Sequence, residues 1–416
     1  MSLAKTSIWM SISIFIKVIT GLIIIKLLSV SFGPSGVGQV GNFRQLIIIL
    51  SSLSGAGIFN GVIKYVAEYY RTPKKLSAVL GTSSSIILGF SVLLIIIFLF
   101  FSSFISFALF GHTRYQIVIY ALAFIQIGIA YANYFLSILR GYRDIQGNAI
   151  SIIVGNLVGI IIYYFCFRLN DYQWTLIGLA LFPALTIIPS AMIIFSYKHF
   201  TIAYLKPCWD SVISRNLGKF TLMTLITSVT LPIAYIIMRN LLAKEYSWNE
   251  VGIWQAVSSI SDIYLQFITI SFNIYLLPTL AKLQDKNLIS IEIFKTLKFI
   301  LPIVFILSSI IWLFRDLIIL LFFSVEFITM RDLFIWQLIG DVLKVSAYVF
   351  GYLIIAKAAL YFYILTEIIQ FILLIAFSYF LIPAYGALGA AQAYMITYIV
   401  YFILYNSIFY FYFRCK

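Results

Sequence analysis

The stretch "KLLSVSFGPSGVGQVGNFRQ", residues 26–45, holds four glycines within ten residues and lies between two long apolar runs. Lys26 and Arg44 flank the glycines, and glycines beside cations occur in loops that bind phosphate. A phosphate loop also needs a preceding strand and a lysine followed by serine or threonine after the glycines, and neither is found here. We therefore expect a tight reversal between two helices, in which glycine and Pro34 end one helix and permit close packing with the next.

The composition on either side of this stretch is that of a membrane protein. Of the 416 residues, 63% are hydrophobic, 18% are aromatic and only 10% are charged, which exceeds what the interior of a soluble domain can bury. Backbone groups in lipid must be satisfied internally, so apolar runs of about 20 residues predict helices and not barrel strands. The sequence predicts an all-α integral membrane protein with about twelve transmembrane helices. They are expected at 8–30, 41–65, 78–101, 116–139, 147–168, 174–196, 217–242, 252–277, 297–322, 333–356, 361–382 and 388–412.

The distribution of charged residues between the loops predicts the orientation of these spans and the division of the chain into two halves. The net charge is +14, but the cations lie mostly in short loops, which indicates membrane topology and argues against a nucleic-acid partner. Eighteen cations fall on the side of the N-terminus and five on the opposite side, so both termini are expected in the cytoplasm. The longest loop, 197–216, is then a cytoplasmic linker between an N-terminal six-helix bundle (1–196) and a C-terminal six-helix bundle (217–416). Shifting the chain by 214 residues places Val37-Gly38 on Val251-Gly252, as a sparse internal repeat would.

Several charged residues fall inside the predicted spans, where an ionised side chain costs at least about 2.5–3.5 kcal/mol. Lys26, Arg44 and Arg239 are expected at the same depth in the outer half of the membrane, and Lys17 lies deeper. If their spans line a central cleft, these four residues form a substrate-binding site for an anionic group such as phosphate. The alternative is that Lys26, Arg44 and Arg239 extend to the lipid headgroups as end-of-helix cations.

Deep acids accompany these cations. Asp341 and Lys344 are spaced i, i+3 on one predicted helix and can neutralise each other. Asp262 has no partner in its own helix, so a counter-ion to Arg239 and a ligand for a coupling ion are both open. Cys166, Cys208 and Cys415 show neither metal-ligand nor disulfide spacing, and we expect no metal, no cofactor and no catalytic residue.

Longer stretches resemble a known family over essentially the whole chain. They include "SFGPSGVGQ" (31–39), "NFRQL" (42–46), "YSWNEVGIWQ" (246–255), "MRDLFIWQLIGDVLKV" (330–345) and "AYVFGYLIIAKA" (347–358). With two six-span halves, the chain resembles the multidrug/oligosaccharidyl-lipid/polysaccharide exporter superfamily. It is more closely similar to the Wzx-type flippases, and among them to those for lipid III in enterobacterial common antigen biosynthesis.

The resemblance implies a fold and a function. Two helix bundles would surround a V-shaped cavity lined chiefly by spans one, two, seven and eight, which carry Lys17, Lys26, Arg44, Arg239 and Asp262. An undecaprenyl-diphosphate-linked oligosaccharide would move from the cytoplasmic to the periplasmic leaflet of the bacterial inner membrane by alternating access. The pathway's polymerase and chain-length regulator would be partners.

Two other function classes are weighed against a flippase. A drug or cation antiporter on the same fold would be expected to need cavity carboxylates, whereas deep cations outnumber deep acids here. A membrane-embedded glycosyltransferase would need a catalytic domain, for which the short loops leave little room.

Overall fold

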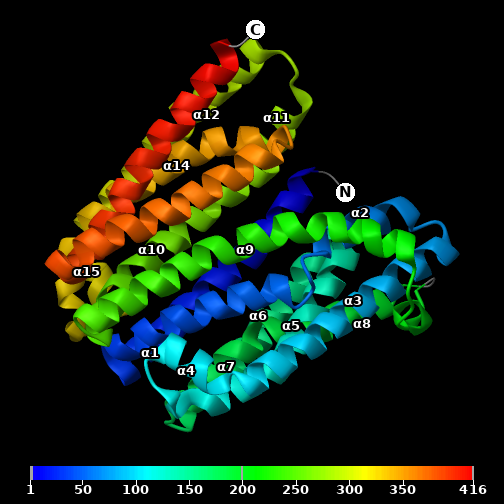
Figure 1. The fold of residues 1–416 in the computed structure, drawn as a ribbon, viewed down its shortest axis with the longest axis horizontal. Coiled ribbons are helices and arrows are strands. Elements are labelled where there is room, and N and C mark those ends of the chain that lie inside the picture. The colour runs from blue at the N-terminus through cyan, green and yellow to red at the C-terminus, as the bar shows by residue number, and fades with distance from the viewer. Residues whose placement is uncertain (1–2, 198–199, 415–416) are drawn as a thin grey trace. The chain divides into compact units, whose positions relative to one another are not determined.

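The computed structural model describes residues 3–197 and 200–414, which form helices and short connections and no strand (Figure 1). The chain forms two compact units: residues up to Ile24 with Asn42–Pro232, and Ile25–Gly41 with the residues from Ile233 onward. Helices α1 (Leu3–Leu53) and α9 (Ser211–Glu245) contribute to both units. The first unit also holds α2 (Phe59–Tyr69), α3 (Pro73–Phe100), α4 (Ser102–Phe110), η1 (Thr113–Tyr115), α5 (Gln116–Gly141), α6 (Ile145–Arg168), α7 (Tyr172–Ala184), α8 (Ile187–Phe195) and η2 (Ile202–Leu205). The second also holds α10 (Trp248–Ser271), η3 (Phe272–Leu276), α11 (Leu277–Lys282), α12 (Lys286–Leu313), α13 (Arg315–Phe322), η4 (Val325–Leu333), α14 (Phe334–Ala356) and α15 (Leu360–Arg414).

Helix α1 contains the reversal expected from the glycine-rich stretch. A straight helix of 51 residues would be about 75 Å long, more than twice the thickness of the hydrocarbon core. Gly33 interrupts it with φ 60° and ψ −166°, a conformation that side chains with a Cβ rarely adopt. Pro34 follows directly. The prediction of a helix–helix turn in place of a phosphate loop is confirmed.

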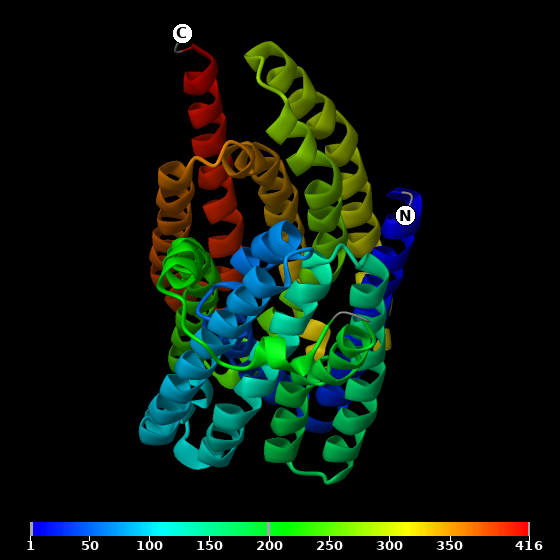
Figure 2. The same cartoon turned by 90° about the vertical axis from the view of Figure 1, so that its right-hand side faces the viewer.

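Helix α15 is divided in the same way. Its 55 residues are interrupted at Gly386, with φ 58° and ψ −133°, three residues after Pro383. Figures 1 and 2 show the orange first arm and the red second arm running side by side. One helix assignment therefore covers two predicted spans, 361–382 and 388–412.

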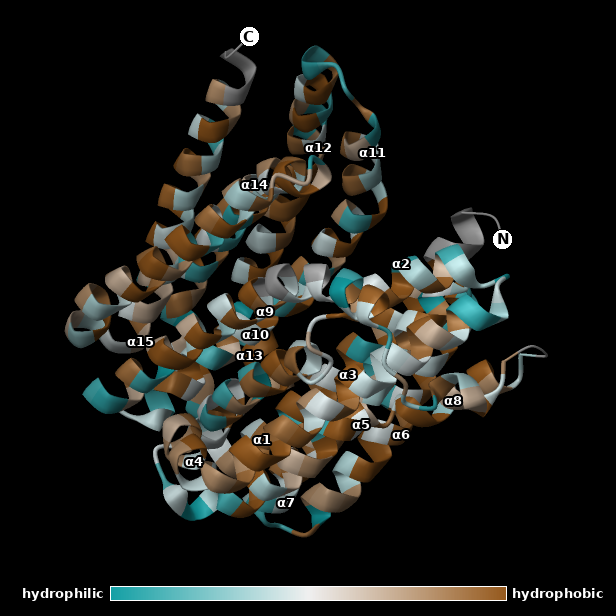
Figure 3. Ribbon diagram, turned by 45° about the vertical axis from the view of Figure 1, so that its right-hand side comes forward, coloured by the Kyte–Doolittle hydropathy of each residue, from teal (hydrophilic) through white to brown (hydrophobic). Residues whose placement is uncertain are grey.

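Within residues 3–197 and 200–414, ten helical stretches are long and apolar enough to cross a membrane. Each predicted span overlaps one of them, and Ile8–Leu53 and Leu360–Phe411 hold two spans each. Figure 3 shows hydrophobic residues along the helices and hydrophilic ones mainly at the connections. The chain is a multi-pass membrane protein.

Two boundaries differ from the predictions for physical reasons. The predicted span 41–65 is broken at 54–58, where Ala56 and Gly57 have positive φ angles of 49° and 69°. The predicted span 297–322 is divided between the second half of α12, which begins at Lys286 and ends at Leu313, and the whole of α13. The start of α12 is capped by Asp285, whose side chain accepts the backbone N–H of Asn287 at 2.8 Å.

The linker region belongs to the first unit. The backbone N–H of Cys208 donates to the carbonyl of Gly81 at 3.3 Å, and the N–H of Asp210 donates to Oγ1 of Thr82 at 3.2 Å, which ties the linker to α3. The boundary between the units falls later, at Pro232 within α9. The division into repeated six-helix bundles at 197–216 stays a prediction. Cys166 and Cys208 are free thiols, and Cys415 lies outside the described residues.

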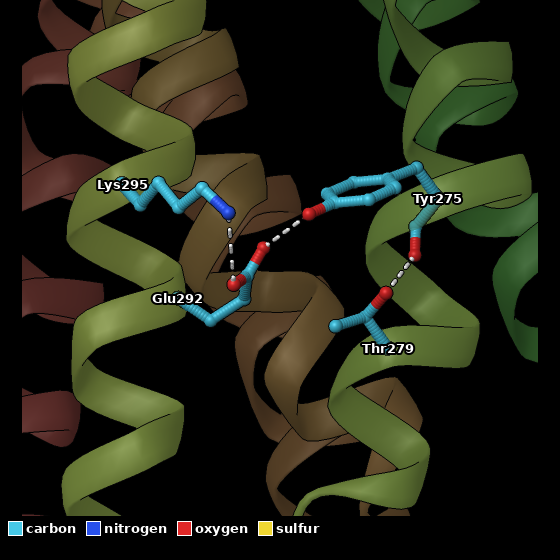
Figure 4. A network of polar contacts seen from close by, with 4 residues as sticks. All are labelled: Tyr275, Thr279, Glu292 and Lys295. Atoms are coloured by element: carbon cyan, nitrogen blue, oxygen red, sulfur yellow. Dashed lines mark hydrogen bonds and ion pairs between the residues drawn. The ribbon is translucent and has the colours of Figure 1, made fainter.

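A π-helical turn in the second unit, η3, joins α10 to α11 within one continuous helical stretch. Segment η3 precedes Pro278, whose missing N–H disturbs the α-helical hydrogen bonds of this turn. The hydroxyl of Tyr275 donates to Glu292 of α12 at 2.8 Å, and Lys295 lies 3.8 Å from the same carboxylate (Figure 4). Thr279 donates to the backbone carbonyl of Tyr275 at 2.7 Å.

Candidate substrate-binding site

Lys26 is held at the end of a neighbouring helix of the second unit. Its Nζ donates to the carbonyl of Phe323 at 2.7 Å and to that of Leu320 at 3.2 Å, at the C-terminal end of α13. The last carbonyls of a helix have no partner within it and carry partial negative charge, so a lysine is stabilised there. Nearby, a Cβ on Gly33 would lie 2.8 Å from Oε2 of Glu326. In this structure Lys26 is a helix-capping cation.

Arg239 is buried in a polar and aromatic environment, with 2% of its surface exposed. Its Nε donates to Oε1 of Gln255 at 2.8 Å, and its guanidinium carbon lies 5.3 Å from the Trp254 ring and 5.6 Å from the Tyr235 ring. Gln255 in turn donates to Oγ of Ser259 at 3.0 Å. These contacts fix the orientation of a cation that the sequence placed in the site.

Glycines allow α1 to approach this arginine closely. A Cβ on Gly41 would lie 2.5 Å from Oε1 of Gln255 and 2.8 Å from Nε of Arg239. A Cβ on Gly38 would lie 2.8 Å from the carbonyl of Trp248, and one on Gly252 would overlap the backbone of Pro34. These glycines permit close packing of α1 with α10. Close packing between the two helices that the turn joins stays a prediction.

Asp341 is fully buried on α14 and accepts two tyrosine hydroxyls. Tyr264 of α10 donates to Oδ2 and Tyr394 of α15 donates to Oδ1, each at 2.7 Å. Tyr264 also lies 3.4 Å from Oγ of Ser308 on α12. Hydrogen bonds from neutral donors stabilise a buried carboxylate without an adjacent cation.

Lys344 lies one turn further along α14, among aromatic rings. Its Nζ is 5.3 Å from the ring centre of Tyr398, 5.5 Å from that of Tyr394 and 5.8 Å from that of Tyr348, within cation–π range. The described residues contain no direct ion pair between Asp341 and Lys344, so the expected i, i+3 pairing is not formed. Both Asp262 and Asp341 attract Lys344 electrostatically over a longer distance.

The second unit thus brings Arg239, Asp262, Asp341 and Lys344 into one polar cluster. Tyr235 connects them, because it stacks near Arg239 and also interacts with Asp262 and Lys344. The sequence analysis found the charged members and missed Gln255 and the tyrosines. The tyrosines of α15 could have been predicted from the sequence, because the spacing of Tyr394, Tyr398, Tyr401 and Tyr405 places them on one face of a helix. All four are buried.

Lys17 and Arg44 belong to the first unit. Lys17 is exposed on α1, and Arg44 is half-buried and interacts electrostatically with the buried Tyr163 of α6. A cationic lining that joins these residues to Lys26 and Arg239 stays a prediction. In the described part of the chain, no three His, Cys, Asp or Glu side chains converge as a metal site would require.

Comparison with known proteins gives this cluster its context. The sequence model for the family described as "Polysaccharide biosynthesis protein" matches residues 3–284. The chain belongs to this polysaccharide biosynthesis protein family. It is 57% identical over 409 residues to the lipid III flippases of Escherichia coli (strain K12) and Shigella flexneri, with 98% of this chain and 98% of each relative covered.

Solved structures share the fold of this family member at low sequence identity. An inward-facing multidrug resistance MATE transporter of the MOP superfamily superposes with a TM-score of 0.80 at 15% identity, covering 95% of each chain. The lipid II flippase MurJ, in an inward closed conformation, superposes with a TM-score of 0.76 at 18% identity, covering 96% of this chain and 87% of that one. These likenesses show the fold, and the prediction of an all-α fold with membrane-spanning helices is confirmed.

Proposed function

We propose that this protein is a lipid III flippase, which moves an undecaprenyl-diphosphate-linked oligosaccharide from the cytoplasmic to the periplasmic leaflet by alternating access. The observation that carries the proposal is 57% identity to two lipid III flippases, over 98% of the chain. The chain's proposed task is transport, with no covalent chemistry on the substrate.

A drug or cation antiporter is the competing function on the same fold. The MATE transporter has a higher TM-score than MurJ, but at 15% identity it supports the fold alone. Charge argues against cation transport, because Lys17, Lys26, Arg44, Arg239 and Lys344 outnumber the deep acids Asp262 and Asp341.

The diphosphate is the proposed ligand of Lys17, Lys26, Arg44 and Arg239. An arginine presents a planar fork of donors that matches phosphate, and a lysine acts as a compact charge. Lys26 already donates to two carbonyls of α13, so binding of the diphosphate exchanges these bonds for phosphate oxygens. The exchange links occupation of the site to the position of α13.

Asp262, Asp341 and Lys344 are proposed as coupling or counter-ion residues. Tyr235 lies beside Arg239 and interacts electrostatically with Asp262 and Lys344, and Lys344 interacts in turn with Asp341. A change in charge at these residues therefore alters the electric field at the arginine. An ion gradient acting on these residues is the proposed drive.

The topology follows from the loop charges. We propose an inner-membrane location with both termini in the cytoplasm, because loops on the N-terminal side carry the excess of cations. The pathway's polymerase and chain-length regulator are the proposed protein partners.

The test is movement of an undecaprenyl-diphosphate oligosaccharide across vesicles that contain the purified protein, with and without an imposed proton gradient. Arg44→Glu should abolish movement and leave membrane insertion intact, because it reverses a charge at the proposed diphosphate site. Arg168→Glu is the matched control, since it reverses an exposed arginine at the end of α6 and should move substrate normally. Wild-type protein that fails under both conditions contradicts the function, and exchange of drug cations would then support the antiporter. Normal movement by Arg44→Glu removes this residue from the site.

A further inference from the structure

A pocket lies in the first unit and is lined by none of the residues of the polar cluster. Its volume is about 490 Å³, and it is formed where the α2–α3 connection, the α5–α6 connection and the chain after α8 meet. Tyr70, Tyr142, Tyr197, Phe200 and Tyr204 supply aromatic walls, and Arg143 and Asp144 supply charge. Pockets of this size that combine aromatic walls with a few polar groups commonly bind small ligands or headgroups.

Asp144 is part of the frame of this pocket. Its Oδ1 accepts the backbone N–H of Gly147 at 2.8 Å and caps α6, and its Oδ2 accepts the hydroxyl of Tyr197. Burial and this hydrogen bond raise the pKa of Tyr197, so its hydroxyl remains a donor. The Tyr197 ring packs edge to face on Tyr142, with ring centres 5.4 Å apart. Both carboxylate oxygens are therefore engaged within the protein.

Arg143 occupies a backbone position at which glycine is the usual residue. It has φ 60°, directly after the end of α5. Its N–H donates to the carbonyl of Arg140 at 3.0 Å, and the N–H of Asp144 donates to that of Leu139 at 2.9 Å. These two bonds define a Schellman motif, whose left-handed residue is strained when it carries a Cβ. The backbone conformation at this position favours glycine. The presence of arginine therefore indicates a role for its side chain.

The guanidinium of Arg143 is exposed and forms no ion pair with any described residue. Other exposed cations lie next to lining residues in the sequence: Arg71, Lys74 and Lys75 are neighbours of Tyr70, Pro73 and Leu76, and Lys206 follows Tyr204 by two residues. Arg71 also stacks over Tyr70, one of the aromatic walls, at 5.2 Å. This charge distribution is complementary to an anion.

The chain after α8 places the pocket at the level of lipid headgroups. Its large apolar side chains point outward, with Ile202 73% exposed, Trp209 65% exposed and Val212, at the start of α9, 70% exposed. Exposed tryptophan and aliphatic side chains beside cations are typical of a segment that lies in the membrane interface. The same segment contributes Phe200 and Tyr204 to the pocket, so a ligand reaches it from the bilayer surface.

We propose that this pocket binds the phosphate headgroup of a membrane lipid, with Arg143 as the phosphate ligand and the tyrosines around the headgroup. The lipid-borne phosphate comes either from an anionic phospholipid or from a prenyl diphosphate. Its placement in the cytoplasmic leaflet rests on the topology proposed above. The site is separate from the four cations assigned to the diphosphate during transport.

The test compares Arg143→Gly with Asn170→Gly in the full-length protein, in nanodiscs of zwitterionic phosphatidylcholine. Asn170 is the matched control, because it is also left-handed, with φ 53°, but lies in the α6–α7 connection outside the pocket. Binding of added phosphatidylglycerol and of undecaprenyl diphosphate is titrated in separate arms by native mass spectrometry. Arg143→Gly should weaken binding in at least one arm by about tenfold to a hundredfold, the loss expected for a charge-assisted hydrogen bond. Its melting temperature should not fall, since glycine relieves the backbone strain.

The arm that responds identifies the source of the phosphate. Unchanged binding of both lipids to Arg143→Gly, or an equal loss in Asn170→Gly, would overturn the proposal. Binding is measured without transport, so wild-type protein that binds lipid through Arg143 but moves no substrate would contradict the flippase function and leave this site intact.

Discussion

Replacing Gly41 by alanine should disrupt the setting of Arg239 while adding a single methyl group. The new Cβ would lie 2.5 Å from Oε1 of Gln255 and 2.8 Å from Nε of Arg239, whereas carbon and its neighbours pack at about 3.5–4.0 Å. Helix α1 cannot easily withdraw, because Gly38 and Pro34 contact the backbone of α10 nearby. The alanine must therefore separate Arg239 from Gln255 or strain both helices.

The magnitude follows from these two outcomes. Overpacking of a closely packed site costs about 1–3 kcal/mol, and a lost hydrogen bond of a buried charge costs about 1.5–3 kcal/mol. Because either outcome is sufficient, we expect Gly41→Ala to lower the free energy of unfolding by about 1–3 kcal/mol. Gly21→Ala is the control on the same helix, because nothing lies within 4 Å of its Cβ position, and it should be neutral or stabilising by up to about 1 kcal/mol.

The assay is unfolding of the purified protein in detergent micelles, followed by circular dichroism, as part of a double-mutant cycle. Gln255→Ala removes the atom nearest the new methyl group, so the double variant should be little less stable than Gln255→Ala alone. The coupling energy should exceed about 1 kcal/mol, as expected for residues in contact. Additive effects, or a Gly41→Ala variant as stable as Gly21→Ala, would refute the reasoning.

Substitutions at three further residues test the hydrogen bonds of Asp341 and of Lys26. Tyr264→Phe and Tyr394→Phe each remove one hydrogen bond to Asp341. Each should lower the free energy of unfolding by about 1–3 kcal/mol and slow substrate movement in vesicles. Unchanged stability of both variants would show that other donors satisfy this carboxylate. Lys26→Ala should speed amide hydrogen exchange at the end of α13 and impair transport, because it removes the hydrogen bonds to the last carbonyls of this helix. Lys26→Arg retains the charge and should have a smaller effect on both. Equal effects of the two variants would indicate that the packing of the lysine side chain matters and not its charge.

The glycine-rich stretch illustrates what can be predicted locally. Gly33 and Pro34 predicted a break between helices because backbone preference depends on the residues themselves, and the break is found at Gly33. Apolar runs predicted the membrane spans for a similar reason, since each span must satisfy its own backbone in lipid. The break at 54–58 was missed, because Ala56 adopts its left-handed conformation against local preference.

The charged residues mark the limit of this reasoning. Their presence within spans was evident from the sequence, because an ionised group in lipid needs a partner or water wherever it lies. The partners were not evident: Lys26 bonds to carbonyls almost 300 residues away, and Asp341 bonds to tyrosines of α10 and α15. Sequence alone determined the spans, the turn at Gly33 and the charges that need compensation. Only tertiary structure decided what compensates them, because hydrogen bonds form between whichever groups helix packing brings within about 3 Å.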